Sequence, residues 1–253
     1  MFNDWFTIGP FTVHGYGVMV AIGILSALFL GERICKKKGL DADNVDNMVL
    51  FTVLIGYIFS KITYCLTIFD EFIKDPSIAF KSGGWVVYGG IIGGLFGMWL
   101  YCKYKKYDVL AYLNALAPCV ALAQGFGRIG CFLAGCCYGI ETDLPIGVHF
   151  PAGSLGPSPD MSVLPTQLIM AIGDFIIFYL LYHNLFKGKH PEKTAAYYLI
   201  LYSIGRFLIE FIRGDAQRGF IGPLSTSQFI SIFILLLGIF FLKKESDEPI
   251  PHN

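Results

Sequence analysis

The sequence predicts an all-α polytopic membrane protein with about seven transmembrane helices, an outer N-terminus and a cytoplasmic C-terminus. Three observations favour this fold class: an apolar composition, long apolar runs, and an uneven distribution of basic residues between alternate loops. The 253 residues are 55% hydrophobic and only 15% charged, with a mean hydropathy of +0.59, whereas a soluble domain is about 25% charged. This composition excludes an ordinary soluble protein and a disordered chain. The 19 basic and 19 acidic residues cancel, so no basic surface for nucleic acid is indicated.

A helix needs about 20 mostly apolar residues to cross the hydrocarbon core of a bilayer. Several of the runs that fit are short or interrupted by glycine, which suits helices that pack closely through small residues. The fourth run is the weakest because Pro118 lies inside it. In order, the runs are Tyr16–Gly31, Asn47–Leu66, Trp85–Tyr101, Val109–Ala123, Thr166–Phe186, Thr194–Ile212 and Ser227–Leu242.

Basic residues mark one side of the membrane. They gather in the loops after the first, third and fifth runs and after the last run, and cytoplasmic loops are the ones that carry excess Lys and Arg. This predicts the stated orientation. The first run is preceded by no Lys or Arg, so we expect it to be retained and not cleaved as a signal peptide. The clustered residues are Arg33, Lys36, Lys37, Lys38, Lys103, Lys105, Lys106, Lys187, Lys189, Lys193, Lys243 and Lys244.

We expect one integral-membrane domain over residues 1–253, with an extracytoplasmic loop region around residues 139–165. This loop is the longest polar stretch and is rich in Pro and Gly. Such a composition is typical of an irregular surface loop or lid.

Two basic residues, Lys61 and Arg206, fall inside predicted spans, where charge is costly and usually functional. Glu210 is four residues after Arg206, so the two share a helix face, and Arg213 lies on a similar face. These charges indicate either an ion pair that fixes packing or a cationic site for an anionic headgroup near the outer surface. Lys61 has a second interpretation, in which its stem reaches toward the outer interface.

The densest constellation is residues 125–139, GFGRIGCFLAGCCYG, whose five glycines are poor helix formers. Glycines permit tight turns and close approach of the backbone to a ligand. Backbone N–H groups beside Arg128 would make a phosphate receptor, and the outer ends of the fourth and sixth helices would bring Arg128 near Arg206. The alternative is a packing segment whose arginine caps carbonyl groups.

Three of the seven cysteines, Cys131, Cys136 and Cys137, fall in this segment. The chain has no Cys-x-x-Cys motif and no nearby His at zinc spacing, so a metal site is not favoured. A disulfide between Cys131 and Cys136 or Cys137 stays open if that face is oxidising. The favoured interpretation is that small cysteine side chains fill a tight bundle.

Five motifs in order make the chain resemble the prolipoprotein diacylglyceryl transferase family, from about Ile8 to Lys244. The order is more specific than any single motif, and the family's seven-span topology with an outer N-terminus agrees with the distribution of charge. The motifs are IGPFTVHGYG at Ile8–Gly17, YGGIIG at Tyr88–Gly93, GRIG at Gly127–Gly130, PTQL at Pro165–Leu168 and GRFLIEFIR at Gly205–Arg213.

The resemblance implies transfer of the diacylglyceryl group of phosphatidylglycerol to the lipobox cysteine of a prolipoprotein in the bacterial plasma membrane. Glycerol 1-phosphate leaves, and the reaction needs no metal or other cofactor. Catalytic roles are implied for Arg128, Arg206 and Tyr88. Substrate binding is implied for Arg128, Tyr16, His14, Gly89, Gly127, Gly130, Gln167, Glu210 and Arg213.

The chain departs from the family pattern at several polar positions. Tyr88 replaces a histidine and, with an ordinary pKa near 10, it is a poor base at neutral pH, although it can donate a hydrogen bond. Two asparagines and a glutamate are replaced by Cys131, Ala134 and Cys136, and a histidine by Leu164. Two alternatives therefore stay open: a related membrane transferase with another lipid donor or acceptor, and a non-enzymatic lipid-binding or transport protein.

Overall fold

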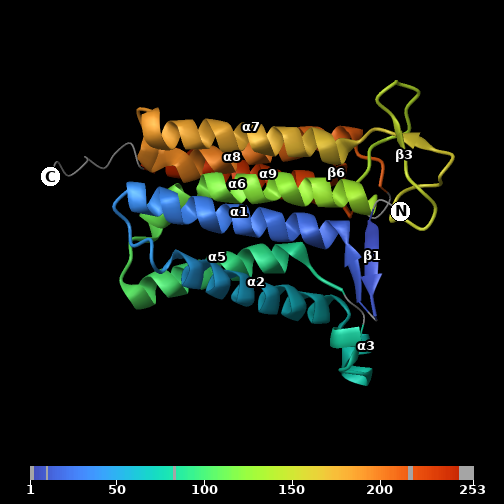
Figure 1. Ribbon diagram of the computed structural model, residues 1–253, viewed down its shortest axis with the longest axis horizontal. Coiled ribbons are helices and arrows are strands. Elements are labelled where there is room, and N and C mark those ends of the chain that lie inside the picture. Colours follow the sequence, from blue (N-terminus) through green and yellow to red (C-terminus); the bar gives the residue numbers. More distant parts are fainter. Residues whose placement is uncertain (1–2, 10, 82–83, 216–218, 245–253) are drawn as a thin grey trace. The chain divides into compact units, whose positions relative to one another are not determined.

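A computed structural model describes residues 3–9, 11–81, 84–215 and 219–244, and it is mostly helical (Figure 1). The helices are α1 (Gly15–Lys37), α2 (Val45–Thr67), α3 (Phe69–Lys74), α4 (Ile78–Lys81), α5 (Val87–Lys105), α6 (Val109–Ala134), α7 (Thr166–Lys187), α8 (Thr194–Ile209) and α9 (Thr226–Lys244), with 3-10 turns η1 (Pro191–Lys193) and η2 (Glu210–Ile212). Short antiparallel pairs are formed by β1 (Asp4–Ile8) with β2 (Phe11–His14), β3 (Val148–His149) with β4 (Ser162–Val163), and β5 (Phe220–Ile221) with β6 (Leu224–Ser225).

Six helical segments in the described part of the chain are long and apolar enough to cross a membrane. They are α1, α2, α6, α7, α8 with its flanking turns, and α9. The chain is therefore a polytopic membrane protein, as the sequence predicts. The remaining predicted run, Trp85–Tyr101, forms most of α5, which contains five glycines and is not among these six segments. The count of seven spans and the outer N-terminus stay predictions.

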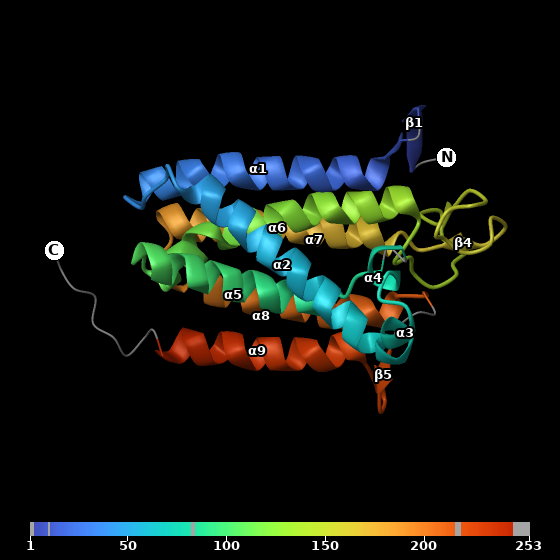
Figure 2. The same ribbon diagram turned by 90° about the horizontal axis from the view of Figure 1, so that it is seen from below.

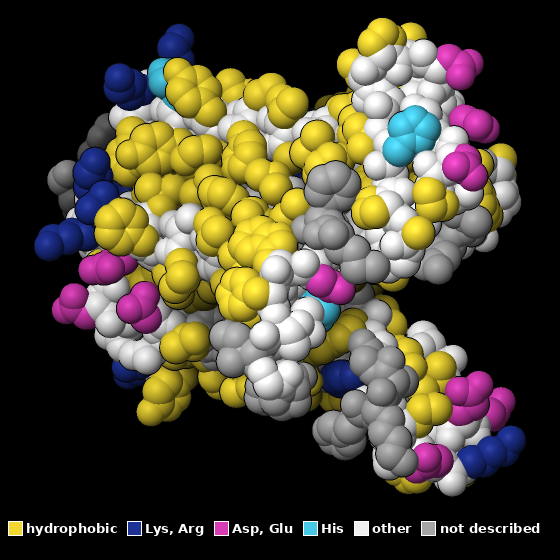
Figure 3. Space-filling view, turned by 45° about the vertical axis from the view of Figure 1, so that its right-hand side comes forward, with side chains coloured by type: hydrophobic (Ala, Val, Ile, Leu, Met, Phe, Trp, Pro, Cys, Tyr) yellow, Lys and Arg dark blue, Asp and Glu magenta, His cyan; other side chains and the backbone are white. Residues whose placement is uncertain are grey.

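Large hydrophobic side chains cover the sides of the helices (Figure 3). Leu25 and Leu54 are 65% and 56% exposed, and Phe240 is 59% exposed. Apolar surface on this scale marks contact with lipid or with a partner. On helices of spanning length, it fits the hydrocarbon core of a bilayer.

The chain divides into two compact units, Met1–Leu30 with Leu113–Asn253, and Gly31–Tyr112. In the first unit, α8 packs against both α7 and α9, and α9 runs alongside α8 in Figure 2. Its core contains Ala117, Ala121 and Leu181. Residues 1–30 contribute the start of α1, where a Cβ on Gly23 would lie 3.0 Å from the Ala123 carbonyl oxygen of α6.

The segment between α6 and α7 has little regular structure, which fits the predicted irregular loop. Among the described residues, only β3, β4 and two isolated bridges interrupt it, one between Gly139 and Arg213 and one between Glu141 and Val163. Its placement outside the membrane stays a prediction, as does the single domain.

In the second unit, α2 crosses α5 through a row of glycines on α5 (Figure 2). A Cβ on Gly97 would lie 3.0 Å from the Ile55 Cβ, and one on Gly93 would overlap the Phe59 side chain. Small residues at such spacing allow two helix backbones to approach closely in a membrane. Gly89, a predicted substrate-binding residue, continues this row and is buried against Thr63.

Lys61 of α2 holds the segment that leads into α5. Its Nζ donates hydrogen bonds to the Ala79 and Gly84 carbonyl oxygens at 2.9 and 3.0 Å. The ammonium group also lies 4.8 Å from the Trp85 ring centroid, a cation–π distance. The contacts give Lys61 a structural role within its own unit.

The glycine row gives a matched test of packing. We expect Gly93→Ala to destabilise the protein by about 1–3 kcal/mol, the usual cost of overpacking. Gly94→Ala, one residue along, is expected to be neutral or stabilising by up to about 1 kcal/mol because alanine favours a helix, and its Cβ would meet only Thr52 Cγ2 at 3.8 Å. Thermal unfolding in detergent, followed by circular dichroism, measures both; equal melting temperatures would contradict the packing argument.

Candidate functional site

A buried carboxylate joins two arginines at the end of α8. Glu210 is only 1% exposed at its side chain, and its Oε2 lies 2.8 Å from Arg206 Nη1 and 3.6 Å from Arg213 Nη1. The first pair spans four residues, as the sequence predicts for one helix face. Opposite charges compensate one another here, since an unpaired charge in this environment is costly.

Both arginines have further partners that fix their guanidinium groups. Arg206 Nη2 donates to the Ser227 hydroxyl at 2.7 Å, which connects α8 to α9. Arg213 Nε donates to Asp215 Oδ1 at 2.9 Å, and its Nη2 donates to the other carboxylate oxygen. This bidentate geometry is the strong form of an arginine–carboxylate contact. The donors of Arg213 are therefore largely committed within the protein. Arg206 donates one hydrogen bond to Ser227, and its Nη1 is ion-paired with Glu210 without a hydrogen-bond partner among the described residues.

Arg128 lies on α6, and this position corrects an expectation about the glycine-rich segment. The glycines were expected to free backbone N–H groups for a phosphate, but α6 continues to Ala134. The N–H groups around Arg128 are therefore part of a helix, since tertiary packing overrides the low helix propensity of glycine. The irregular backbone begins only at Gly135, whose φ is +84°. Phosphate binding by the Arg128 side chain stays a prediction.

The guanidinium group of Arg128 is uncommitted among the described residues. It makes no hydrogen bond or salt bridge there, in contrast with Arg206 and Arg213, and its charge interacts with Asp174 and Tyr202. Arg206 interacts electrostatically with Arg128 and with Tyr202 as well. The structure thus brings Arg128 and Arg206 within electrostatic range, as predicted from the ends of the fourth and sixth spans.

A pocket of about 300 Å³ lies between α7 and α8. Its polar lining includes Arg206, Asp174 and Tyr202, and most of the rest is aliphatic. Gly173 and Gly205 also line it, and a Cβ on either glycine would meet no atom within 4 Å. The pocket is therefore open at both glycines, and it combines a cation with apolar walls, as a lipid with an anionic headgroup requires.

Asp174 is the residue that sequence reasoning missed. It is 5% exposed, lies inside a spanning helix, and its Oδ2 has no hydrogen-bond partner among the described residues. The signal was present, because an acidic residue in an apolar run is a functional candidate for the same reason as a basic one. Tyr202 carried no such signal, since tyrosines are common in this sequence.

Gln167 has a scaffolding position. It is fully buried, and its Nε2 donates to the Cys136 carbonyl oxygen at 2.8 Å. Thr166 donates to the Cys137 carbonyl oxygen at 2.7 Å. The start of α7 thus fixes the loop after α6. The predicted contact of Gln167 with substrate stays a prediction.

The N-terminal residues of the predicted site lie in the same unit as the arginines. His14 Nδ1 is 2.7 Å from Asp4 Oδ1, and the Tyr16 backbone N–H donates to Asn3 Oδ1 at 3.1 Å. The Tyr16 ring is 44% exposed, and its hydroxyl interacts electrostatically with Arg128. Tyr16 is thus available to a ligand of Arg128.

The predicted glycines separate into two kinds. Gly130 packs against α1, where a Cβ would lie 3.2 Å from the Tyr16 carbonyl oxygen. Gly127 has no atom within 4 Å of such a Cβ, so it leaves room beside Arg128. Tyr88 is 38% exposed on α5 in the other unit, and its catalytic role stays a prediction.

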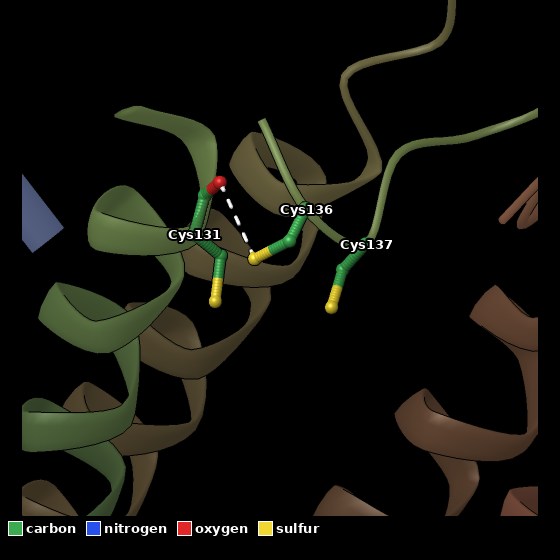
Figure 4. Close-up of side chains that lie close together, drawn as sticks. All are labelled: Cys131, Cys136 and Cys137. Carbon is green, nitrogen blue, oxygen red and sulfur yellow. Dashed lines mark hydrogen bonds between the residues drawn. The ribbon is translucent and has the colours of Figure 1, made fainter. Parts of the chain in front are cut away.

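Three thiols gather at the end of α6, one from its last turns and two from the segment that follows (Figure 4). The sulfur atoms of Cys131, Cys136 and Cys137 all lie within 4.8 Å of one another, and all three cysteines are free. The two neighbouring thiols lower the pKa of Cys137, and the charges of Arg213 and Arg128 lower it further. The Cys136 thiol donates to the Cys131 carbonyl oxygen at 3.7 Å. Sequence reasoning favoured plain packing residues; the clustering depends on the turn after Gly135, which spacing alone does not reveal.

The motifs, the helical membrane fold and the paired arginines agree with a comparison against known families. The family model of prolipoprotein diacylglyceryl transferase matches residues 3–243. The chain belongs to this family.

Named prolipoprotein diacylglyceryl transferases of clostridia are close relatives. A phosphatidylglycerol–prolipoprotein diacylglyceryl transferase of Clostridium tetani (strain Massachusetts / E88) is 45% identical over 90% of this chain and 91% of its own length. A protein of Clostridium perfringens (strain 13 / Type A) with the same name and the number 2 is 46% identical over 90% and 89%. A third, from Clostridioides difficile (strain 630), is 30% identical over 92% and 91%.

Removal of the central carboxylate should be costly. We expect Glu210→Gln to destabilise the protein by about 3–5 kcal/mol, because it leaves two buried arginines without their shared counter-charge. Thermal unfolding in detergent measures the change.

The matched control is Asp215→Asn, the same chemical change at the other carboxylate partner of Arg213. Its side chain is 16% exposed against 1% for Glu210, so water can compensate part of the loss, and a smaller destabilisation is expected. A larger effect from Asp215→Asn would contradict the central role of Glu210.

Proposed function

We propose that this chain transfers the diacylglyceryl group of phosphatidylglycerol to the lipobox cysteine of prolipoproteins in the bacterial plasma membrane. The products are a thioether-linked lipid and glycerol 1-phosphate. Family membership and the names of close relatives support this reaction. The observation that carries it in the structure is the uncommitted guanidinium of Arg128, which interacts electrostatically with Asp174 and Tyr202 of the pocket between α7 and α8.

Arg128 is assigned to the phosphodiester. A guanidinium group binds two phosphate oxygens through parallel N–H donors, and Arg128 has donors to offer while Arg206 and Arg213 are held by carboxylates. Arg206 contributes its charge from the pocket wall. The aliphatic lining of the same pocket suits the glyceryl backbone and the first carbons of the acyl chains.

The charge arrangement favours the departure of the phosphate. The cysteine sulfur attacks the glyceryl carbon, the carbon–oxygen bond to phosphate breaks, and the new sulfur–carbon bond forms. One more negative charge develops on the leaving phosphate oxygen. Fixed cations interact more strongly with this developing charge than with the intact phosphodiester. They therefore lower the activation barrier of the transfer.

Asp174 is assigned as the acceptor of the thiol proton. The attacking group must be a thiolate, and an ordinary thiol with a pKa near 8.5 is mostly protonated at neutral pH. Asp174 lines the pocket and has a carboxylate oxygen without a hydrogen-bond partner in the described part of the chain. This chain has Tyr88 in place of the family's histidine, and Asp174 is the residue to which the role of base is assigned instead.

Arg128 can be tested with purified protein, phosphatidylglycerol and a synthetic lipobox peptide. We expect Arg128→Gln to lower turnover by about 100-fold to 1000-fold, the usual loss when a transition-state donor is removed. Glycerol 1-phosphate release and peptide mass should fall together. Arg128→Lys should recover part of the rate, because it keeps the charge but loses the bidentate geometry.

Arg33→Gln, the same change near the end of α1, serves as the control and should leave turnover unchanged. Normal product formation by folded Arg128→Gln would remove Arg128 from the site. A wild-type protein inactive with phosphatidylglycerol but active with another lipid in a donor panel would favour the related transferase instead.

The role assigned to Asp174 predicts that its replacement changes the pH dependence of turnover. We expect Asp174→Asn to lower the rate at neutral pH by about 100-fold or more, as loss of a general base does. The deficit should shrink as the pH rises toward 9, because more of the acceptor thiol is then ionised without help. Asp143→Asn in the exposed loop is the control. A deficit that stays constant across the pH range would show that Asp174 is not the proton acceptor.

A further inference from the structure

We propose that Cys131, Cys136 and Cys137 form a binding site for one zinc-class cation, with three thiolate ligands and one open coordination position. The three sulfur atoms lie within 4.8 Å of one another. In a tetrahedral site with zinc–sulfur bonds of about 2.3 Å, sulfur atoms are about 3.8 Å apart. Small side-chain rotations that move each sulfur atom by up to roughly 1 Å would bring the sulfur–sulfur distances to the value of a zinc site.

The local fold presents the three thiols together. Cys131 lies in the last turns of α6, and the chain then reverses through Gly135 and Cys137, both with positive φ. Gln167 and Thr166 hold the carbonyl groups of Cys136 and Cys137. Hydrogen bonds from the start of α7 thus fix the backbone of two ligands, as precise metal sites require.

The surrounding charge suits thiolates. Arg213 and Arg128 both interact electrostatically with Cys137, and Arg128 also interacts with Cys131. Three thiolates around a divalent cation carry one net negative charge, which these guanidinium groups compensate. Thiolate sulfur selects soft or borderline cations such as zinc and excludes magnesium and calcium.

The number of ligands suggests what the ion does. No His or carboxylate joins the three thiols in the described ranges, and three protein ligands with an open position are typical of catalytic zinc sites. A thiol takes such a position readily and loses its proton on coordination. This role rests on the proposed function: the open position would bind the thiol of the acceptor cysteine.

The binding test uses the full-length protein in detergent, reduced, treated with chelator and titrated with Co²⁺ as a spectroscopic probe for zinc. We expect one equivalent to bind, with a sulfur-to-cobalt charge-transfer band that Zn²⁺ then abolishes. Each of Cys131→Ser, Cys136→Ser and Cys137→Ser should weaken binding at least tenfold. Absence of the band in protein whose thiols are reduced would overturn the site.

Cys65→Ser provides the matched control, because Cys65 lies on α2, outside the thiol group. It should leave the cobalt band and the affinity unchanged. Equal weakening by Cys65→Ser would show that the effect is not specific to the three thiols. Zinc should also raise the melting temperature of the wild-type and Cys65→Ser proteins, but not of the three other variants.

Turnover of metal-free and zinc-loaded protein then separates the two proposals. Faster turnover with zinc, with the gain largest below pH 8, supports coordination of the acceptor thiol. Equal rates in the two forms would overturn that role while the spectroscopic site stands. Transfer by protein that binds no metal would overturn the zinc site and leave the proposed function intact.

Discussion

The ion pairs of Glu210 are the constraint on which the candidate site depends. Its carboxylate is buried between Arg206 and Arg213, where either cation alone would be costly to keep away from water. The same contacts hold the last turn of α8 against the following segment. That segment is tied to the loop after α6, because the Ile140 N–H donates to the Ile212 carbonyl and the Gly214 N–H donates to the Tyr138 carbonyl.

This arrangement divides the work between three arginines. Carboxylates form ion pairs with Arg206 and Arg213, so these two hold the architecture and supply a fixed positive field. Arg128 comes from a different helix and keeps its donors for a ligand. Such a site can bind an anionic headgroup while its own ion pairs stay in place. The charges of the pocket are therefore preorganised.

Glycine has three different consequences in this chain. On α5 it lets α2 approach, as Gly93 and Gly97 show. On α6, Gly130 accommodates α1, whereas Gly127 leaves open space beside Arg128. Gly173 and Gly205 open the pocket itself. Glycine therefore serves helix packing at some positions and leaves ligand space at others, and the neighbours of each glycine decide which.

The sequence by itself determined the membrane class, the apolar runs from which the long helices form, the order of the family motifs and the shared helix face of Arg206 and Glu210. These features follow from hydropathy and from the period of a helix, which act over short distances along the chain. The tertiary structure alone decided that α6 continues through the glycine-rich segment, that Asp174 meets a pocket with Arg206, and that three thiols gather beside Arg128. These outcomes depend on contacts between α6, α7 and α8, which are far apart in sequence. A local sequence pattern does not reveal which side chains remain without a partner after the helices have packed.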